Sequence, residues 1–285
     1  MPGTEETLKP YLKWAGGKRQ LLPQIRLHLP ADFADRTYYE PFVGAGAVLF
    51  ELHPTRAVIN DFNSQLILTY RMIRDEVDAL VAALREHQRQ NSREYYYTIR
   101  QMDREPDAFH ALPDVEKAAR LIFMNKTCYN GLYRVNSQGL FNVPYGRYRN
   151  PAICEEGTLR AVSRYLRDNA VEICNGDFEQ AVEGAGEDAF VYFDPPYHSP
   201  GNTNFTGYQP DGFTEADQRR LRDTAIRLTE RGAKCLLSNS DTEFIRELYS
   251  APCFHIHTVQ AKRAINSNSA GRGDVTEVLI QNWQE

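Results

Sequence analysis

The stretch from Val191 to Tyr197 constrains the fold more than any other part of the sequence. It reads Val-Tyr-Phe-Asp-Pro-Pro-Tyr, a β-branched and aromatic run that ends in turn residues, and this pattern is typical of a buried strand. In an open α/β sheet, ligands bind outside the carboxyl ends of the strands, so we expect Asp194 to face a ligand rather than the core. The two prolines then fix the backbone, because neither has an N–H and the φ angle of each is locked at about −65°.

The side chains of this stretch suggest a chemistry. The Asp194 carboxylate and the Pro195 carbonyl, which Pro196 holds in an extended conformation, are two acceptors that suit an amino group on a ring. Acceptors on both N–H bonds favour the pyramidal nitrogen that attacks a methyl sulfonium, and the ring of Tyr197 offers a face for a planar base. The geometry therefore fits N-methylation of a nucleobase, although the bare tetrapeptide Asp-Pro-Pro-Tyr also occurs as an ordinary turn after a strand.

Two further motifs precede this stretch. Residues Lys13–Lys18 read Lys-Trp-Ala-Gly-Gly-Lys, and residues Glu40–Gly46 read Glu-Pro-Phe-Val-Gly-Ala-Gly. Together with Asp-Pro-Pro-Tyr, and in this order, they resemble the motifs of the Dam-type (D12 class) DNA adenine N6-methyltransferases. The resemblance implies a Rossmann-like α/β sheet that binds S-adenosylmethionine and transfers its methyl group to a flipped adenine. The catalytic residues that it implies are Asp194, Pro195, Pro196 and Tyr197.

The chain order also predicts a cofactor site. We expect Tyr38–Phe42 to be the first strand and Gly44–Gly46 to be the tight turn into a helix that begins near Ala47. Ala57–Asp61 is expected to be the second strand, and Asp61 stands where an α/β cofactor site uses a carboxylate for ribose hydroxyls, although it could also cap a helix. With the resemblance added, the expected cofactor-binding residues are Trp14, Lys18, Glu40, Phe42, Gly44, Gly46, Asp61, Asp177, Phe178 and Asp194.

An insertion is expected after the second strand. From Ser64 to about Lys126 the apolar spacing is helical over more residues than one crossover needs. The polar, aromatic and basic stretch Lys126–Arg149 follows, and its second half has the alternation and glycines of a hairpin. By its position and by resemblance, this insertion is the target-recognition domain. The predicted domains are 1–63 with 168–285 as the catalytic domain and 64–167 as the mainly helical insertion.

The residues of this stretch suggest how DNA is read. The Arg134 guanidinium matches the O6 and N7 acceptors of guanine, although it could instead be a phosphate contact. Leu132 and Pro144 can pack on a thymine methyl group, and Arg147 and Arg149 can neutralise phosphates. The resemblance implies double-stranded GATC as the target and assigns further DNA contacts to Lys13, Tyr129, Asn130 and Tyr148. Arg263, in a basic loop between the last two predicted strands, is a further expected DNA contact.

The distribution of charge agrees with a nucleic-acid partner. The net charge is −5, yet residues 7–31 contain five Lys or Arg and no acid, residues 117–154 contain six and no acid, and residues 259–273 contain three and no acid. Acid-free basic segments on an otherwise acidic chain favour a phosphate-contacting surface over three merely solvated loops.

Composition excludes several other classes. The five cysteines are scattered without a Cys-x-x-Cys pair, which argues against a disulfide framework and a zinc site, and we expect no metal. Apolar runs fall short of the ~20 residues that span a bilayer, and a signal-peptide core is lacking, so we expect a cytoplasmic protein near the nucleoid of a prokaryotic or phage-infected cell. Double-stranded DNA is the expected partner, and a separately acting restriction endonuclease is a further candidate.

Rival readings of the motifs are weaker. Gly16–Lys18 is not a phosphate-binding loop, because the Walker pattern needs Gly and Ser/Thr where this chain has Leu12 and Arg19. The glycine turn also lacks the third glycine of a nicotinamide site, where Leu49 stands. At Asp194, cytosine N4-methylation and protein-glutamine methylation would favour Ser and Asn respectively, and cytosine C5-methylation needs a Cys nucleophile. A DNA-binding module without catalysis remains the alternative of another class, and the three intact motifs argue against it.

Overall fold

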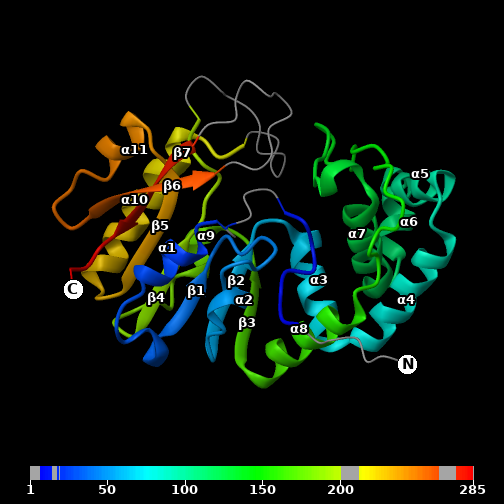
Figure 1. The fold of residues 1–285 in the computed structure, drawn as a ribbon, viewed down its shortest axis with the longest axis horizontal. Helices are drawn as coiled ribbons and strands as arrows, with labels where there is room; N and C mark the ends of the chain where they lie inside the picture. The colour runs from blue at the N-terminus through cyan, green and yellow to red at the C-terminus, as the bar shows by residue number, and fades with distance from the viewer. Residues whose placement is uncertain (1–6, 15–17, 19, 200–211, 263–273, 285) are drawn as a thin grey trace.

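The computed structural model describes residues 7–14, 18, 20–199, 212–262 and 274–284. In this part of the chain, seven strands form one sheet in the order β3-β2-β1-β4-β5-β7-β6 (Figure 1). Strands β1 to β5 are parallel, whereas β7 runs antiparallel to both of its neighbours, β5 and β6. The strands are β1 (Thr37–Glu40), β2 (Arg56–Asp61), β3 (Ala170–Asn175), β4 (Ala189–Phe193), β5 (Lys234–Ser240), β6 (His255–Lys262) and β7 (Asp274–Gln281).

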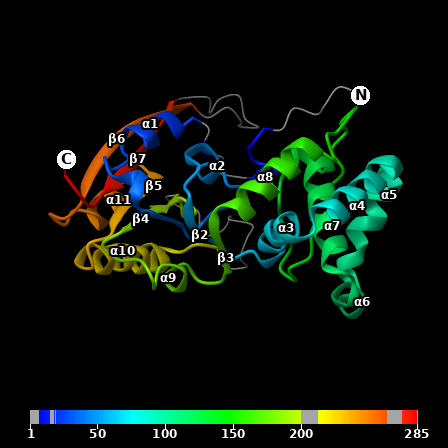
Figure 2. The same cartoon turned by 90° about the horizontal axis from the view of Figure 1, so that it is seen from below.

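Strand β4 lies in the middle of the sheet and is buried on both faces. Phe190 and Tyr192 pack into the core beneath α1, α2 and α3, whereas Val191 and Phe193 pack into the core beneath α9, α10 and α11 (Figure 2). Alternate residues of a strand point to opposite faces, so a strand covered on both faces requires a continuous apolar run. The helices on the two faces are α1 (Leu22–Leu27), α2 (Leu49–Leu52), α3 (Ser64–Asp75), α9 (Phe178–Ala181), α10 (Glu215–Glu230) and α11 (Glu243–Leu248).

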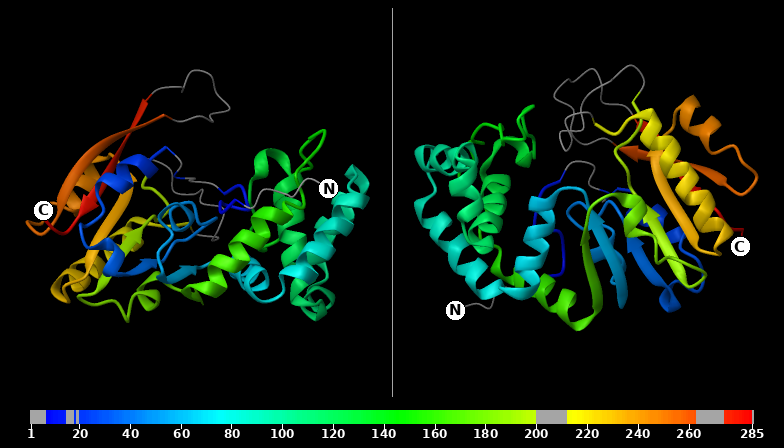
Figure 3. Two further views of the ribbon diagram at one scale, coloured as in Figure 1. Left: turned by 60° about the horizontal axis from the view of Figure 1, so that its bottom comes forward. Right: turned by 180° about the vertical axis from the view of Figure 1, so that it is seen from behind.

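A helical part stands beside the sheet, between β2 and β3 in the chain (Figure 3). Helix α3 packs against β3 on one side and against α7 and α8 on the other, so it joins this part to the sheet. The side chain of Asn63 caps α3 by accepting from the N–H of Leu66. The remaining helices are α4 (Val77–Gln90), α5 (Arg93–Gln101), α6 (Pro106–Ala111), α7 (Asp114–Thr127) and α8 (Glu156–Asp168), with short 3₁₀ turns η1 (Phe33–Asp35), η2 (Met102–Arg104) and η3 (Tyr129–Gly131).

The predicted α/β class is confirmed, and some element bounds differ from the prediction. The first strand ends at Glu40 rather than Phe42, because Pro41 has no N–H to donate to the sheet. The helix expected near Ala47 begins at Leu49. The predicted hairpin consists of two isolated bridges, Cys128 with Tyr145 and Val135 with Phe141, instead of a continuous ladder.

None of the helices in the described ranges combines the length and the apolar character that crossing a membrane requires.

Candidate active site

Asp194 follows the last residue of β4, at the carboxyl edge of the sheet. Its side chain is 18% exposed, and Lys18 Nζ lies 2.7 Å from its Oδ1. Ser238 of β5 donates its hydroxyl to the same oxygen over 3.0 Å. Burial raises the pKa of Asp194, while the charge and hydrogen bond of Lys18 and the hydrogen bond of Ser238 act in the opposite direction. Both partners bind Oδ1, and within the described part of the chain Oδ2 stays open to a further donor.

The two prolines after Asp194 present carbonyls in different situations. The Pro196 carbonyl accepts from Gln218 Nε2 of α10 over 2.9 Å. Gln218 is 1% exposed, and its own oxygen accepts from Asn239 of β5 over 3.0 Å, so this contact is rigidly held. Among the described residues, no donor reaches the Pro195 carbonyl. The turn therefore offers two acceptors, Asp194 Oδ2 and the Pro195 oxygen, to a ligand.

Tyr197 completes this turn. Its hydroxyl donates to Glu277 of β7 over 2.9 Å, which fixes the ring. Lys18 Nζ lies 4.3 Å from the ring centroid, so one face of the ring is covered by an ammonium group.

The glycine turn after β1 requires glycine at two positions. Gly44 and Gly46 have φ angles of +51° and +75°, which disfavour other residues. A Cβ on Gly46 would lie 2.7 Å from the ring of Phe50 and 2.8 Å from the hydroxyl of Tyr70. A Cβ on Gly44 would approach Trp14 to 3.0 Å, so Trp14 lies directly against the turn.

Asp61 ends β2 beside this turn. Its Oδ2 accepts from the N–H of Gly44 over 3.1 Å and its Oδ1 from the N–H of Asn63 over 2.9 Å. Burial raises the pKa of Asp61 to about 6, and the two backbone hydrogen bonds limit the rise. Counting the contacts of the described residues, each oxygen keeps an unused lone pair, so a pair of neighbouring hydroxyl groups could still bind.

Glu40 ends β1 and is placed under the site rather than at its surface. It is 2% exposed, and its Oε2 finds no hydrogen-bond donor among the described residues. Burial raises the pKa of Glu40 well above the ordinary value for a glutamic acid.

Asp177 and Phe178 follow β3, on the far side of β2 from Asp194. Asp177 caps α9 by accepting from the N–H of Glu179 over 2.9 Å. The Phe178 side chain is 5% exposed and stacks on Phe42 with ring centroids 5.4 Å apart. Among the described residues the backbone N–H of Phe178 has no acceptor, so this pair offers a carboxylate and an adjacent N–H.

Comparison with known proteins decides which family this site belongs to. A family model described as "D12 class N6 adenine-specific DNA methyltransferase" matches residues 14–265, the larger part of the chain. The chain belongs to this family. It is an adenine-specific DNA methyltransferase, as the three motifs led us to expect.

Individual relatives extend the match over nearly the full chain. The Type II methyltransferase M1.LlaDCHI of Lactococcus lactis subsp. cremoris is 46% identical over 97% of this chain and 96% of its own length. The Type II methyltransferase M.MjaIII of Methanocaldococcus jannaschii is 43% identical over 97% of this chain and 99% of its own length. The DNA adenine methylase of Escherichia coli K12 is 36% identical over 94% of this chain and 93% of its own length.

The stretch that the sequence assigned to DNA recognition lies at one end of the methyltransferase's helical part. Tyr129 and Asn130 form an exposed turn in which Asn130 has a φ angle of +56°. The Asn125 amide ties the turn to the N-terminal segment, because it donates to the carbonyls of Lys13 and Gly131 over 2.7 and 3.0 Å. A Cβ on Gly131 would lie 2.5 Å from the Lys13 side chain, so glycine is needed for this close approach.

The hairpin of the methyltransferase presents Arg134 at the surface. Arg134 Nε donates to Asn142 across the hairpin over 2.7 Å, and the Arg134 carbonyl accepts from the Asn142 N–H over 3.0 Å. The hydrogen bond to the side chain uses one edge of the guanidinium and orients the remaining donors. Leu132 and Pro144 are exposed, and Leu132 is one of the large apolar side chains that the methyltransferase leaves in water.

The remaining predicted DNA contacts divide into three kinds. Arg147 and Arg149 are exposed. Tyr148 lies beneath Lys13, with Nζ 4.7 Å from the ring centroid. Arg263 lies outside the described residues.

Several residues of the methyltransferase's site escaped the sequence interpretation. Phe62 follows Asp61 and is 57% exposed, although its position after a strand-ending acid was visible in the sequence. Ser238 and Gln218, which hold the turn after β4, lie in ordinary strand and helix patterns that carry no signal of this contact. Asp103 and Arg120 form a buried ion pair of 3.0 Å behind the hairpin, and buried charges in a helical stretch have no distinctive sequence pattern.

Proposed function

We propose that this methyltransferase transfers the methyl group of S-adenosylmethionine to the N6 amine of a flipped adenine in double-stranded GATC. The single observation that carries the chemistry is the pair of acceptors after β4. Asp194 Oδ2 and the Pro195 carbonyl lie on adjacent residues of a rigid turn, and the Lys18 and Ser238 contacts fix the carboxylate. Two adjacent acceptors are what an exocyclic NH2 group requires.

The chain's contribution to the reaction is positioning. Acceptance of both amine hydrogens localises the nitrogen lone pair, which in free adenine is delocalised into the ring, and directs it at the methyl carbon. Tyr197 offers one ring face for stacking, while Lys18 covers the other. A base must leave the duplex to reach such an edge, and unstacking costs a few kcal/mol. S-adenosylmethionine supplies the activated methyl group on a positively charged sulfur.

The residues at the carboxyl edge fit S-adenosylmethionine. Gly44 and Gly46 have no side chains that would hold a ligand away from the backbone of the turn, and their positive φ angles support this role. Asp61 has the free lone pairs that ribose hydroxyls need. The amine and N1 edge of adenine carries a donor beside an acceptor, which complements the Asp177 carboxylate beside the Phe178 N–H.

The other cofactor-binding residues act from the periphery of this edge. Trp14 packs against the Gly44 turn, and the Phe42 ring supports Phe178 from below. Glu40 is buried, so its part is to support the turn and to offer one acceptor, Oε2. Phe62, exposed next to Asp61, adds an aromatic wall that the sequence interpretation did not include.

We infer that residues 64–167 are the target-recognition domain. Arg134 reads a guanine, Leu132 and Pro144 contact a thymine methyl group, and the exposed Arg147 and Arg149 contact phosphates. By resemblance to Dam-type enzymes, Lys13 reads the outer guanine, and Tyr129 and Asn130 fill the gap left by the flipped base. The exposure of these side chains and the 36% identity to an E. coli DNA adenine methylase support the assignment. Tyr148 and Arg263 complete the proposed DNA-binding set.

The printed names of the relatives support one further partner. Two of them are Type II methyltransferases. A separately acting restriction endonuclease with the same target sequence is therefore the second partner that we propose, beside double-stranded DNA in the nucleoid.

One experiment tests both the chemistry and the sequence. Purified enzyme is incubated with labelled S-adenosylmethionine and with duplexes that contain GATC or single-base variants, and the DNA is digested to nucleosides. We expect label in N6-methyladenine from GATC alone. Arg134→Ala should lose ~1–3 kcal/mol of discrimination at one guanine, whereas Arg149→Ala should slow all duplexes together and reduce the salt dependence. Equal wild-type rates on duplexes without GATC would refute the target sequence, and label in cytosine would refute the chemistry.

A further inference from the structure

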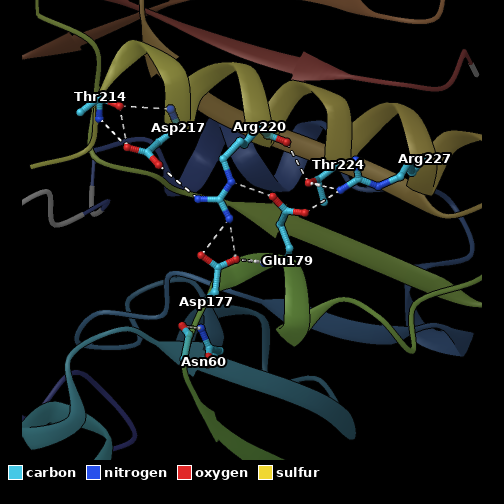
Figure 4. A network of polar contacts seen from close by, with 9 residues as sticks. Asn60, Asp177, Glu179, Thr214, Asp217, Arg220, Thr224 and Arg227 are labelled. Atoms are coloured by element: carbon cyan, nitrogen blue, oxygen red, sulfur yellow. Dashed lines mark hydrogen bonds and ion pairs between the residues drawn. The ribbon is translucent and has the colours of Figure 1, made fainter.

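Arg220 of α10 contacts three carboxylates with its guanidinium group (Figure 4). Its Nε donates to Glu179 over 2.9 Å, and its Nη1 donates to Asp217 over 3.2 Å. Its Nη2 donates to both carboxylate oxygens of Asp177, over 3.1 and 3.0 Å. The guanidinium carbon also lies 5.0 Å from the Phe178 ring centroid. Every nitrogen of the guanidinium therefore donates to a carboxylate, and the group also lies next to the Phe178 ring.

This arrangement differs from an ordinary surface ion pair. An isolated exposed pair holds neither partner in one geometry and contributes little. Here the planar group is held by three acceptors and a ring, so each contact restricts the orientation of the others. The Asp177 carboxylate accepts hydrogen bonds from two groups, the Glu179 N–H at the start of α9 and the Arg220 guanidinium. The two together determine where its carboxylate points.

The position of Arg220 is itself fixed by its helix. Thr214 and Asp217 form a capping box at the start of α10, so the first turn does not fray freely. Gln218, two residues before Arg220, holds the Pro196 carbonyl of the catalytic turn. One helix thus contacts the turn proposed to hold the target amine and the carboxylate proposed to hold the cofactor's adenine.

We propose that Arg220 is a positioning residue for the adenine end of S-adenosylmethionine. It holds the Asp177 carboxylate in the orientation that accepts a hydrogen from the adenine 6-amino group, and it ties that carboxylate to α10. This inference rests on the proposed function, because it takes Asp177 to face the adenine.

The chain offers a matched control in the same network. Arg227 lies on the same helix, is similarly exposed, and pairs with Glu179 over 2.9 Å, but it does not contact Asp177. Arg220→Gln and Arg227→Gln each remove one positive charge and one contact to Glu179. Only Arg220→Gln releases Asp177. Asp177→Ser serves as the reference, since serine retains an oxygen that caps α9 and removes the carboxylate.

The test compares two ligands by calorimetric titration of the intact enzyme variants. One ligand is S-adenosylhomocysteine, and the other is its analogue whose purine lacks the 6-amino group. The wild-type enzyme should bind the first about tenfold more tightly, because a hydrogen bond to a charged acceptor contributes at least that factor. Arg220→Gln should lose most of this preference, as Asp177→Ser does, while Arg227→Gln should keep it. In turnover, Arg220→Gln should raise KM for S-adenosylmethionine and leave kcat unchanged.

The outcomes separate the inference from the function on which it rests. A preference lost in Asp177→Ser but kept in Arg220→Gln overturns the role of Arg220 and leaves Asp177 at the adenine. Equal losses in Arg220→Gln and Arg227→Gln overturn it too, because the effect then follows charge rather than contact. A preference that all variants share with the wild type removes Asp177 from the adenine site and overturns that part of the proposed function.

Discussion

Replacing Lys18 by methionine tests what limits the rise in the pKa of Asp194, the proposed catalytic carboxylate. Lys18 Nζ lies 2.7 Å from Asp194 Oδ1, and the two side chains are 7% and 18% exposed, so the pair is largely removed from water. Burial alone raises the pKa of Asp194, and Lys18 is the strongest opposing influence. Without Lys18 the carboxyl group should bind a proton at higher pH. A carboxyl group that carries a proton on Oδ2 can no longer accept a hydrogen bond there from the target amine.

The expected size of the effect follows from this burial. A hydrogen bond to a charged group contributes about 1.5–3 kcal/mol, and the low exposure of both partners places this pair above the surface value of about 0–1 kcal/mol. At a factor of ten for about 1.4 kcal/mol, methyl transfer by Lys18→Met should fall by roughly 10- to 100-fold at neutral pH. Ser238→Ala removes the weaker partner of the same oxygen and should cause a smaller loss of the same sign.

The assay is single-turnover methyl transfer at saturating S-adenosylmethionine between pH 5.5 and 9. We expect the deficit of Lys18→Met to shrink as the pH rises, because a higher pH restores the Asp194 carboxylate. Lys234→Met is the control, since Lys234 is a partly buried lysine at the amino end of β5, opposite the edge that holds Asp194, and pairs with Asp32 over 3.1 Å. A deficit of the same size at every pH would refute the reasoning and assign Lys18 to cofactor binding alone.

Two further predictions concern the cofactor and the hairpin. The pKa of Asp61 is raised to about 6, so Asp61 becomes protonated as the pH falls through that value, and the cofactor affinity measured by calorimetry should fall with it. Asp61→Asn should bind the cofactor weakly at every pH. A cofactor affinity that still depends on pH in this variant would contradict the assignment of Asp61 to the cofactor site. Asp103→Asn should destabilise the enzyme by about 3–5 kcal/mol, because it leaves Arg120 buried without its charge partner. Hydrogen exchange should then accelerate first at Phe141, whose N–H donates to Asp103 over 2.9 Å, and unchanged exchange there would contradict this role for Asp103.

The catalytic side of the molecule was predictable because strand patterns and short motifs determine it. A strand buried on both faces leaves an unbroken apolar run, as in β4, and the residue after it must lie at the sheet edge. Asp61 was placed by the same argument, and it ends β2 as expected. The limits of this reasoning appear at Lys18. The sequence placed it near the cofactor, yet its contact to Asp194 joins residues 176 positions apart, which no local pattern encodes.

The sequence predicted the helices of the helical part, but it did not predict that their polar side chains support the hairpin. Apolar periodicity identifies α4 and α7 because it reports which face is buried. It says nothing about polar side chains that act at the same buried face. Tyr96 donates to the Val143 carbonyl over 2.8 Å and Asp103 accepts from Phe141, so α5 and η2 hold the hairpin in place. The contact of Arg220 to Asp177 was not predicted for a similar reason, because an arginine on an exposed helix face usually contacts solvent.

The pairing of Lys18 with Asp194 has a consequence for the charge balance of the proposed reaction. The reaction moves one positive charge from a sulfonium to an adenine amine and creates no new charge. A site with an unpaired carboxylate would therefore bind the ground state and the transition state with similar strength, and this would accelerate the reaction little. The Lys18–Asp194 ion pair has no net charge, so only the directed lone pairs of Oδ2 and the Pro195 carbonyl act on the amine. The burial that raises the pKa of Asp194 then serves the last step, because it strengthens the carboxylate as an acceptor for the proton that the methylated amine must lose. Burial thus raises the pKa of Asp194 and Lys18 lowers it, and the pH profile of Lys18→Met measures the balance of these two effects.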